Sequence, residues 1–216
     1  MAVDGIEHLS ASTVSDALDR LGIPGAMSGL APLGPSQRLR GRAYTVRYVP
    51  AGREAGTVGD YIDDVPAGGV VVLANDGRTD CTVWGDILTA VASQRGLAGT
   101  VIDGVCRDVS RALSTGYPIY SRGRFMRTGK DRVEVASTGD TVSVGGVQVN
   151  SGDLIVGDDD GVVVVPARYE AEVLAVATTI ATREAEILDD ALTTGSLREA
   201  RERHGYHQLQ RRQEAK

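Results

Sequence analysis

Apolar positions along the first half of the chain repeat with two spacings, one typical of helices and one typical of strands buried on both faces. The first helical repeat begins near residue 12, where Ser12, Thr13 or Ser15 is a candidate cap, and Gly22 offers a stop. Continuous or β-branched apolar runs separate it from further helical repeats. The predicted helices cover 12–22, 59–69, 85–96 and 107–116, and the predicted strands cover 42–49, 70–75 and 98–104.

The order strand, helix, strand, helix over 70–116 predicts a βαβ arrangement with a parallel core. From Val133 onward, short valine-rich runs alternate with Gly and Asp turns, which predicts antiparallel strands and hairpins. The acidic run at 157–161 fits a hairpin turn better than a metal loop, because so tight a cluster cannot direct every carboxylate at one ion.

The end of the chain reads as a long helix followed by a polar tail. Apolar residues recur at helical spacing from Pro166 to about residue 191. No internal repeat or linker divides residues 1–216, so we expect one domain of the α/β class. The polar tail could be a solvated helix, a frayed end or an arm that reaches a neighbouring subunit, and we expect the segment 167–216 to make contacts in an oligomer.

Composition narrows the classes of protein that the chain could represent. Apolar residues make up 42% and aromatic residues only 4%, so the core must consist mainly of Val, Leu, Ile and Ala. The net charge of −6 argues against binding of nucleic acid through phosphate contacts. We expect a cytoplasmic protein with no membrane partner, because the sequence shows neither a signal peptide nor a long apolar span. Cys81 and Cys106 fit two reduced thiols.

Three charged residues, Asp86, Arg107 and Asp108, fall where predicted strands give way to helices. In open α/β sheets ligands bind at that edge, and the free N–H groups of a first helical turn attract anions. The 20 residues between Asp86 and Arg107 amount to one helix and one strand, which returns the chain to the same edge. Two carboxylates suit a Mg²⁺-type ion that keeps several waters, and an arginine fork suits a carboxylate or enolate oxygen.

A structural explanation of the same residues is simpler on spacing alone. Aspartate often caps helices, which would account for Asp86 and Asp108, and Arg107 could form a surface ion pair with Asp108. The chemical alternative is a divalent ion that chelates a 2-oxo acid, with Arg107 as a second stabiliser of charge on the keto oxygen. That arrangement is suited to forming an enolate of pyruvate by breaking a C–C bond.

The order of motifs along nearly the whole chain resembles the RraA-like family, which includes the class II 4-hydroxy-4-methyl-2-oxoglutarate/4-carboxy-4-hydroxy-2-oxoadipate aldolases. The matching motifs are STVSDAL at 12–18, GRAYTV at 41–46, WGDILTAVASQRGLAGTVIDGVCRD at 84–108, GYPIYSRG at 116–123, GGVQVNSGDLIVGDDDGVVVVP at 145–166, and the closing helix. Aldolases of the family carry an Asp, 20 residues and then Arg-Asp, and Asp86, Arg107 and Asp108 reproduce that pattern. The resemblance implies a β/β/α sandwich of the swivelling-domain type.

The resemblance also implies a role for each site residue. Asp108 would ligate Mg²⁺ or Mn²⁺, and Asp86 would reach the ion through a water and help to move a proton. Arg107 would contact the keto or enolate oxygen. Backbone N–H groups around Gly85, Ile87 and Leu88 would hold the substrate carboxylate.

Assembly and substrate are less firmly indicated. The family implies a homotrimer or homohexamer with the site between subunits, and Glu184 or Glu186 could complete a neighbour's site. The loop with Arg78, Asp80 and Cys81 is expected to shape the far end of the substrate. The acidic residues Asp60, Asp63 and Asp64 are expected to be solvated, and one of them could face the cleft.

These implications favour a metal-dependent lyase that cleaves a 4-hydroxy-2-oxo acid to pyruvate and a carbonyl product, with oxaloacetate decarboxylation as a side activity. The alternative is a catalytically silent regulator that binds a ribonuclease or another protein. The intact set of Asp86, Arg107 and Asp108 favours the enzyme. A methyltransferase activity, sometimes assigned to this family, lacks the support of a glycine-rich cofactor loop.

Overall fold

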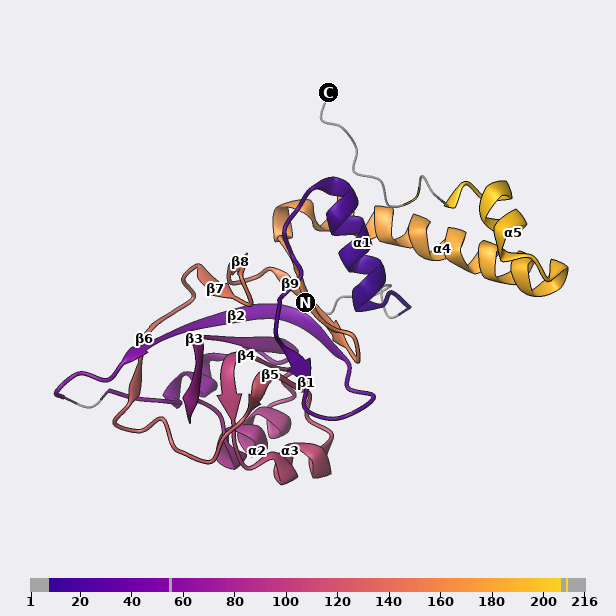
Figure 1. Ribbon diagram of the computed structural model, residues 1–216. Helices are drawn as coiled ribbons and strands as arrows, with labels where there is room; N and C mark the ends of the chain where they lie inside the picture. The colour runs from indigo at the N-terminus through magenta and orange to yellow at the C-terminus, as the bar shows by residue number, and fades with distance from the viewer. Residues whose placement is uncertain (1–7, 55, 207–208, 210–216) are drawn as a thin grey trace.

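The computed structural model describes residues 8–54, 56–206 and 209, and its centre is a mixed sheet of eight strands (Figure 1). The strands of this sheet are β1 (Ala31–Pro32), β2 (Leu39–Pro50), β3 (Gly69–Thr82), β4 (Gly99–Cys106), β5 (Ile119–Arg124), β6 (Val133–Thr138), β9 (Leu154–Asp158) and β10 (Gly161–Val165). A separate hairpin consists of β7 (Val142–Val144) and β8 (Val147–Val149). The helices are α1 (Ala11–Leu21), α2 (Asp86–Gln94), α3 (Val109–Thr115), α4 (Glu170–Thr194) and α5 (Leu197–Arg203), with short 3-10 helices η1 (Asp60–Asp64) and η2 (Ala167–Tyr169).

The sheet has the order β1-β5-β4-β3-β2-β9-β10, and β6 also pairs with β2. The neighbours β2–β3, β3–β4 and β4–β5 are parallel, whereas β2–β6, β2–β9, β9–β10 and β1–β5 are antiparallel. Every residue of β4 is buried, as its continuous apolar sequence predicts for a strand covered on both faces. The predicted α/β class, parallel core and antiparallel valine-rich strands are confirmed.

The sheet lies between two covering layers (Figure 1). Helices α2 and α3 cover one face, where Trp84 stacks on Tyr117 within a cluster of buried apolar residues. The β7–β8 hairpin covers the other face and contributes Val142, Val144 and Val149 to a second cluster. A third cluster forms where α1 and α4 pack against β9 and β10. These three layers hold the carboxyl ends of β3 and β4 in fixed positions beside the starts of α2 and α3.

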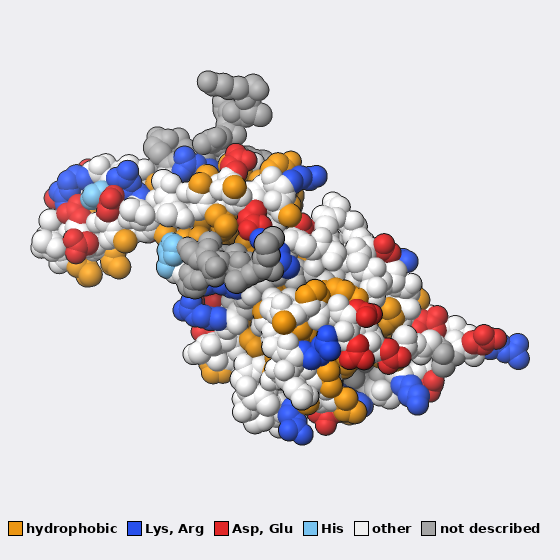
Figure 2. All heavy atoms as spheres, turned by 180° about the vertical axis from the view of Figure 1, so that it is seen from behind, with side chains coloured by type: hydrophobic (Ala, Val, Ile, Leu, Met, Phe, Trp, Pro, Cys, Tyr) orange, Lys and Arg blue, Asp and Glu red, His pale blue; other side chains and the backbone are white. Residues whose placement is uncertain are grey.

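Helix α4 extends beyond the sheet and forms an arm with α5 at its end (Figure 1). Its first part packs through Val173, Ala177 and Ile180 into the α1 cluster, whereas Ile187 belongs to a separate small cluster with α5. Leu188 and Leu192 on this outer part are 59% and 77% exposed. In the view from behind, acidic and basic side chains are interspersed along the arm (Figure 2). Among the described residues, no helix combines the length and apolar character needed to cross a membrane.

Several predicted boundaries need correction. The helix predicted over 59–69 is only a 3-10 turn at Asp60–Asp64, because Pro66 and then Gly68, with φ of 74°, turn the chain into β3. Ser10, rather than a later residue, caps α1 by accepting a hydrogen bond from the Thr13 N–H. The hairpin at 157–161 is confirmed, since β9 and β10 pair antiparallel across it. Cys81 and Cys106 are free, as predicted, and both are buried.

Candidate active site

The predicted residues Asp86, Arg107 and Asp108 meet where β3 leads into α2 and β4 leads into α3. The Arg107 N–H donates a hydrogen bond of 2.9 Å to the Trp84 carbonyl oxygen, which ties the two turns together. The Asp86 N–H lies 3.4 Å from Asp108 Oδ2. Parallel neighbouring strands place their carboxyl ends at one edge, and there the Arg107 and Asp108 side chains lie beside the backbone of Gly85 and Asp86.

Gly85 allows this close approach. A Cβ atom at Gly85 would lie 2.9 Å from Asp108 Oδ2 and 3.3 Å from Arg107 Nε. Its backbone is extended, with φ of −145°, so space rather than backbone conformation requires glycine. Any larger residue would displace the Asp108 carboxylate or the Arg107 guanidinium.

Asp108 has a left-handed backbone, with φ of 55° and ψ of 37°, a conformation that Asp and Asn tolerate better than most residues. Although it occupies the N-cap position of α3, its side chain makes no capping hydrogen bond. Asp108 Oδ2 instead lies 3.2 Å from Arg107 Nε. The capping explanation is therefore wrong for Asp108. The ion pair is about 40% exposed on both sides and contributes at most about 1 kcal/mol to stability.

Asp86 behaves differently, because its Oδ1 accepts a 2.9 Å hydrogen bond from the Ile87 N–H at the start of α2. The capping explanation therefore holds in part for Asp86. The N–H groups of Gly85 and Leu88 have no hydrogen-bond partner among the described residues. The start of α2 thus has free donors for an anion, while Ile87 offers its N–H only if the Asp86 carboxylate turns away.

These groups open into a pocket of about 630 Å³, which is a typical size for a small-molecule site. Asp86 and Arg107 line it together with Gly85, Ile87 and Leu88. Two other segments contribute to the wall, 56–60 and 128–130, and of these the sequence predicted only that an acidic residue could face the cleft. Asp60 and Asp63 are exposed at this wall, so part of the acidic run does face the cleft.

The segment 56–60 is held in place by buried tyrosines and by one glutamate. Tyr48 donates a hydrogen bond of 2.5 Å to the Val58 carbonyl oxygen, and the Tyr48 and Tyr61 hydroxyls are 3.2 Å apart. Burial raises the pKa of both phenols, so they remain neutral donors. The Gly56 N–H donates to Glu134 Oε2 at 3.1 Å. The tyrosine spacing in the sequence gave no signal for this support, because the contacts join a strand to a loop and a 3-10 turn of no regular period.

The loop with Arg78, Asp80 and Cys81 does not line the pocket. The Arg78 guanidinium donates two hydrogen bonds of 2.9 Å to the two Asp80 carboxylate oxygens. Cys81 is buried in the core. This segment continues β3 rather than forming a loop. The expectation that it shapes the far end of the substrate is wrong for this pocket.

Glu184 and Glu186 lie on α4 and do not line the pocket of their own chain. Burial, and then the nearby Asp16 carboxylate, raise the pKa of Glu184. Glu186 is instead paired with Arg183 at 3.0 Å. Of the two, Glu184 has the carboxylate that is less engaged, and a contribution to a neighbour's site stays a prediction.

The donor set at the start of α2 and α3 fits a hard cation that keeps several waters. Among the described residues, no group of three or more His, Cys, Asp and Glu side chains is placed to hold a metal ion. That pattern does not suit a structural zinc site, whereas Mg²⁺ and Mn²⁺ often take only one or two carboxylates. Asp108 Oδ1 accepts no hydrogen bond within the described part of the chain and is free for a cation.

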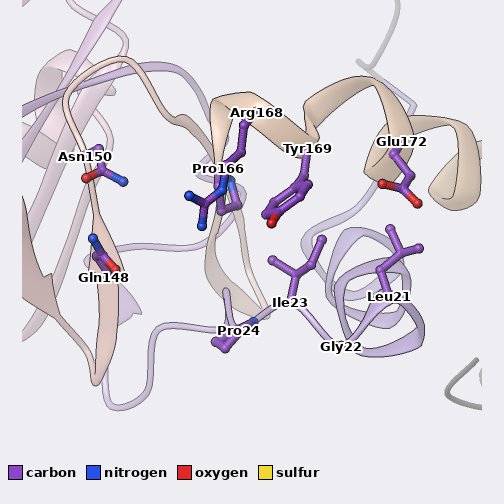
Figure 3. Close-up of a pocket in the computed structure, with 10 residues that line it drawn as sticks. All are labelled: Leu21, Gly22, Ile23, Pro24, Gln148, Asn150, Pro166, Arg168, Tyr169 and Glu172. Atoms are coloured by element: carbon purple, nitrogen blue, oxygen red, sulfur yellow. The ribbon is translucent and has the colours of Figure 1, made fainter. Parts of the chain in front are cut away.

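A second pocket, of about 360 Å³, lies between the end of α1, β8 and the start of α4 (Figure 3). The Arg168 guanidinium lies over the Tyr169 ring, 4.8 Å from its centre. Ile23 and Pro24 form an apolar wall beneath them, and Gln148 and Asn150 lie opposite. None of the residues predicted for the site is found here.

Comparison with known proteins gives matches over most of the chain. The sequence model of the RraA-like family, described as Aldolase/RraA, matches residues 11–164. Protein DlpA of Legionella pneumophila is 41% identical over 205 residues, which cover 93% of this chain but only 33% of DlpA. A Halalkalibacterium halodurans protein named "Putative 4-hydroxy-4-methyl-2-oxoglutarate aldolase" is 36% identical over 163 residues, 74% of either chain.

Solved structures match over a similar extent. An uncharacterized protein of Pseudomonas syringae pv. tomato superimposes with a TM-score of 0.84 and 44% identity, covering 91% of this chain and 94% of its own. Streptomyces coelicolor RraAS2, described as an unusual member of the RNase ES inhibitor RraA protein family, gives a TM-score of 0.75 and 30% identity. That match covers 83% of this chain and 91% of RraAS2.

Proposed function

This chain belongs to the RraA-like family, and on that premise we propose that it is a divalent-metal-dependent lyase. Its substrate is a 4-hydroxy-2-oxo acid, which it cleaves to pyruvate and a carbonyl product. The observation that carries the proposal is the meeting of Arg107 and Asp108 with the start of α2, where Asp86 and free N–H groups line one pocket together with Arg107. The aldolase name of the Halalkalibacterium relative points to the same reaction.

The residues of the site divide the work of this reaction between substrate binding, charge stabilisation and metal binding. The first-turn N–H groups of Gly85 and Leu88, with the positive end of the α2 dipole, hold the substrate carboxylate. Arg107 donates to the keto oxygen and stabilises the negative charge that builds there. Asp108 and Asp86 would hold Mg²⁺ or Mn²⁺, which supplies Lewis-acid stabilisation of the same charge.

The bond changes follow a retro-aldol path. The C4 hydroxyl loses its proton, the C3–C4 bond breaks, and the electron pair leaves as the enolate of pyruvate. The enolate then gains a proton at C3, and the other fragment leaves as a ketone or aldehyde. Asp86 lies at the pocket wall with a half-exposed carboxylate, so it is our candidate for moving a proton. Oxaloacetate would lose CO₂ through the same enolate.

The test is pyruvate release from oxaloacetate and from 4-hydroxy-4-methyl-2-oxoglutarate, with Mg²⁺, with Mn²⁺ and with a chelator. We expect release that depends on the metal and is lost in Asp108→Asn, a change that removes the charge but still tolerates the left-handed backbone. Absence of turnover of both acids with either metal would contradict the lyase function.

A second candidate function is regulation of a ribonuclease, and the 30% identity with RraAS2 is the observation that favours it. Binding to an RNase ES-type enzyme, measured by calorimetry, separates the two functions. A silent regulator would bind and inhibit the ribonuclease equally well as the wild type and as Asp108→Asn. A lyase without this role would show pyruvate release and no binding.

We further propose that the chain assembles into a trimer or hexamer. Large apolar side chains are exposed both at the pocket, where Ile87 is 75% exposed, and on the arm at Leu188 and Leu192. Analytical ultracentrifugation should show a trimer or hexamer for the wild type and a smaller species for the double change Leu188→Glu and Leu192→Glu. A wild-type monomer at micromolar concentration would contradict this assembly.

A further inference from the structure

The pocket contains a second cation, Lys130, which is borne by a different segment from Arg107. The chain has 23 basic residues, of which 21 are arginines and only Lys130 and Lys216 are lysines. Lys216 lies outside the described residues. A chain that uses arginine for nearly all of its positive charge therefore has a lysine in the wall of its candidate active site.

The turn that bears Lys130 is fixed against the strand that leads into the site. Thr128 forms a bridge with Thr82, and a Cβ atom at Gly129 would lie 2.4 Å from the Thr82 carbonyl oxygen. The Gly129 carbonyl oxygen accepts hydrogen bonds from the Arg132 and Val133 N–H groups at 2.8 and 2.9 Å. Because Thr82 is three residues from Gly85, the turn places Lys130 at a set position relative to the start of α2.

Two other charged residues of the pocket, Arg107 and Asp63, have ion-pair partners, whereas the Lys130 ammonium has none in the described part of the chain. Arg107 lies against Asp108 at 3.2 Å, and Asp63 lies 3.9 Å from Arg95. No carboxylate of the described chain comes within 4.0 Å of the Lys130 ammonium. Its side chain is exposed, and lysine acts as a base or nucleophile only when it is desolvated. Lys130 is therefore suited to binding an anion as a point charge.

We propose that Lys130 sets specificity at the far end of the pocket, where its ammonium binds the second carboxylate of a dicarboxylic 2-oxo acid such as the one in the name of the Halalkalibacterium relative. The inference rests on the proposed lyase function, in which the start of α2 and Arg107 hold the pyruvyl end. A pocket of about 630 Å³ is much larger than that three-carbon unit, and Lys130 is the remaining cation in its wall. A substrate with a neutral far end leaves this ammonium unpaired.

Asp60 has the opposite charge to Lys130 and should have the opposite effect on the binding of a dicarboxylate. It lines the same pocket, its side chain is exposed, and it has no ion-pair partner within 4.0 Å in the described part of the chain. Its negative charge opposes a distal carboxylate. Removal of the Lys130 charge should therefore weaken binding of a dicarboxylate, and removal of the Asp60 charge should strengthen it.

Two uncleaved ligands of equal chain length test the inference directly. Titration calorimetry in Mg²⁺ buffer would compare 2-oxoglutarate, which ends in a carboxylate, with 2-oxopentanoate, which ends in a methyl group. We expect the wild type to prefer 2-oxoglutarate, Lys130→Met to lose about tenfold or more in affinity for it, and both to bind 2-oxopentanoate alike. Lys130→Arg should restore most of the preference, and Asp60→Asn should increase it.

Arg127→Met is the matched control, because Arg127 is an exposed cation three residues away that does not line the pocket. It should leave both affinities unchanged. If both acids bind and their ratio of affinities is the same in wild type and Lys130→Met, the role of Lys130 is overturned while the lyase function stands. If neither acid binds and oxaloacetate yields no pyruvate, both proposals fail. Steady-state kinetics on 4-hydroxy-4-methyl-2-oxoglutarate and 4-hydroxy-2-oxopentanoate give a second readout. Lys130→Met should lower kcat/KM for 4-hydroxy-4-methyl-2-oxoglutarate, which has the distal carboxylate, and leave kcat/KM for 4-hydroxy-2-oxopentanoate unchanged.

Discussion

The pocket at the start of α2 and the pocket between α1, β8 and α4 are both open to solvent, but their polar groups are engaged in different ways. In the first, the Gly85 and Leu88 N–H groups and the Lys130 ammonium lack partners within the described chain. In the second, Arg168 stacks on Tyr169, and Asn150 donates to Asp153 through both its backbone and its side chain. The first pocket lies where parallel strands end, and the second where a helical arm meets the sandwich.

This contrast teaches that a candidate site is recognised by polar groups that have no partner within the protein, rather than by the volume of the pocket. The first N–H groups of a helix that starts at the carboxyl edge of a parallel sheet have no acceptor within the helix, so they remain unpaired. At a junction between packed elements, the polar groups bond to one another and hold the elements together. Four substitutions should sharpen or break this distinction.

Arg107→Ala should have the largest effect. Loss of the guanidinium removes the stabiliser of charge on the keto oxygen, so kcat for pyruvate release should fall by about 10²–10³-fold. The thermal midpoint should hardly change, because the ion pair with Asp108 is exposed. Arg111→Ala, an exposed arginine of α3 without an ion pair among the described residues, should keep full activity. Equal losses in both variants would show that the effect is not specific to the site.

Gly85→Ala should come next. The added Cβ would lie 2.9 Å from Asp108 Oδ2 and push that carboxylate away, so activity should fall, by less than the roughly 10²-fold that a 1 Å misplacement costs. The extended backbone accepts alanine, so the protein should still fold. Gly52→Ala, whose Cβ would have no neighbour closer than 3.8 Å, is the matched control. Wild-type activity in Gly85→Ala would contradict the role of close packing at this turn.

Tyr48→Phe should have an intermediate effect on stability. It leaves the Val58 carbonyl oxygen without its buried donor, which should lower the free energy of unfolding by about 1–2 kcal/mol in a denaturant titration. Because Val58 belongs to the pocket wall, KM should rise more than kcat falls. A change in kcat alone would mean that this wall takes part in the chemical step.

Arg168→Ala should have the smallest effect. It removes the cation over Tyr169, which is worth about 0.5–1 kcal/mol at an exposed site, and it lies outside the candidate active site. Pyruvate release should stay at the wild-type rate. A large loss of activity would show that the second pocket is coupled to the first and would break the contrast drawn between them.

The sequence allowed prediction of the features that depend on local patterns. The parallel core followed from the apolar runs at 70–75 and 98–104, and the neighbourhood of Asp86 and Arg107 followed from the 20 residues between them. The unpredicted parts depend on contacts between distant segments. Thr128–Lys130 reaches the pocket through its bridge to Thr82, and 56–60 is held by Tyr48 and Glu134. The short strand β5 has too few residues for a clear period.

The near absence of lysine has a practical consequence for labelling chemistry. Reagents that acylate primary amines will find only Lys130, Lys216 and the chain's α-amino group in this protein, because arginine does not react with them. A fluorophore attached at Lys130 would therefore lie in the wall of the pocket without any engineered cysteine. Slower acylation at that position when a dicarboxylic oxo acid is present would report occupancy of the pocket in real time.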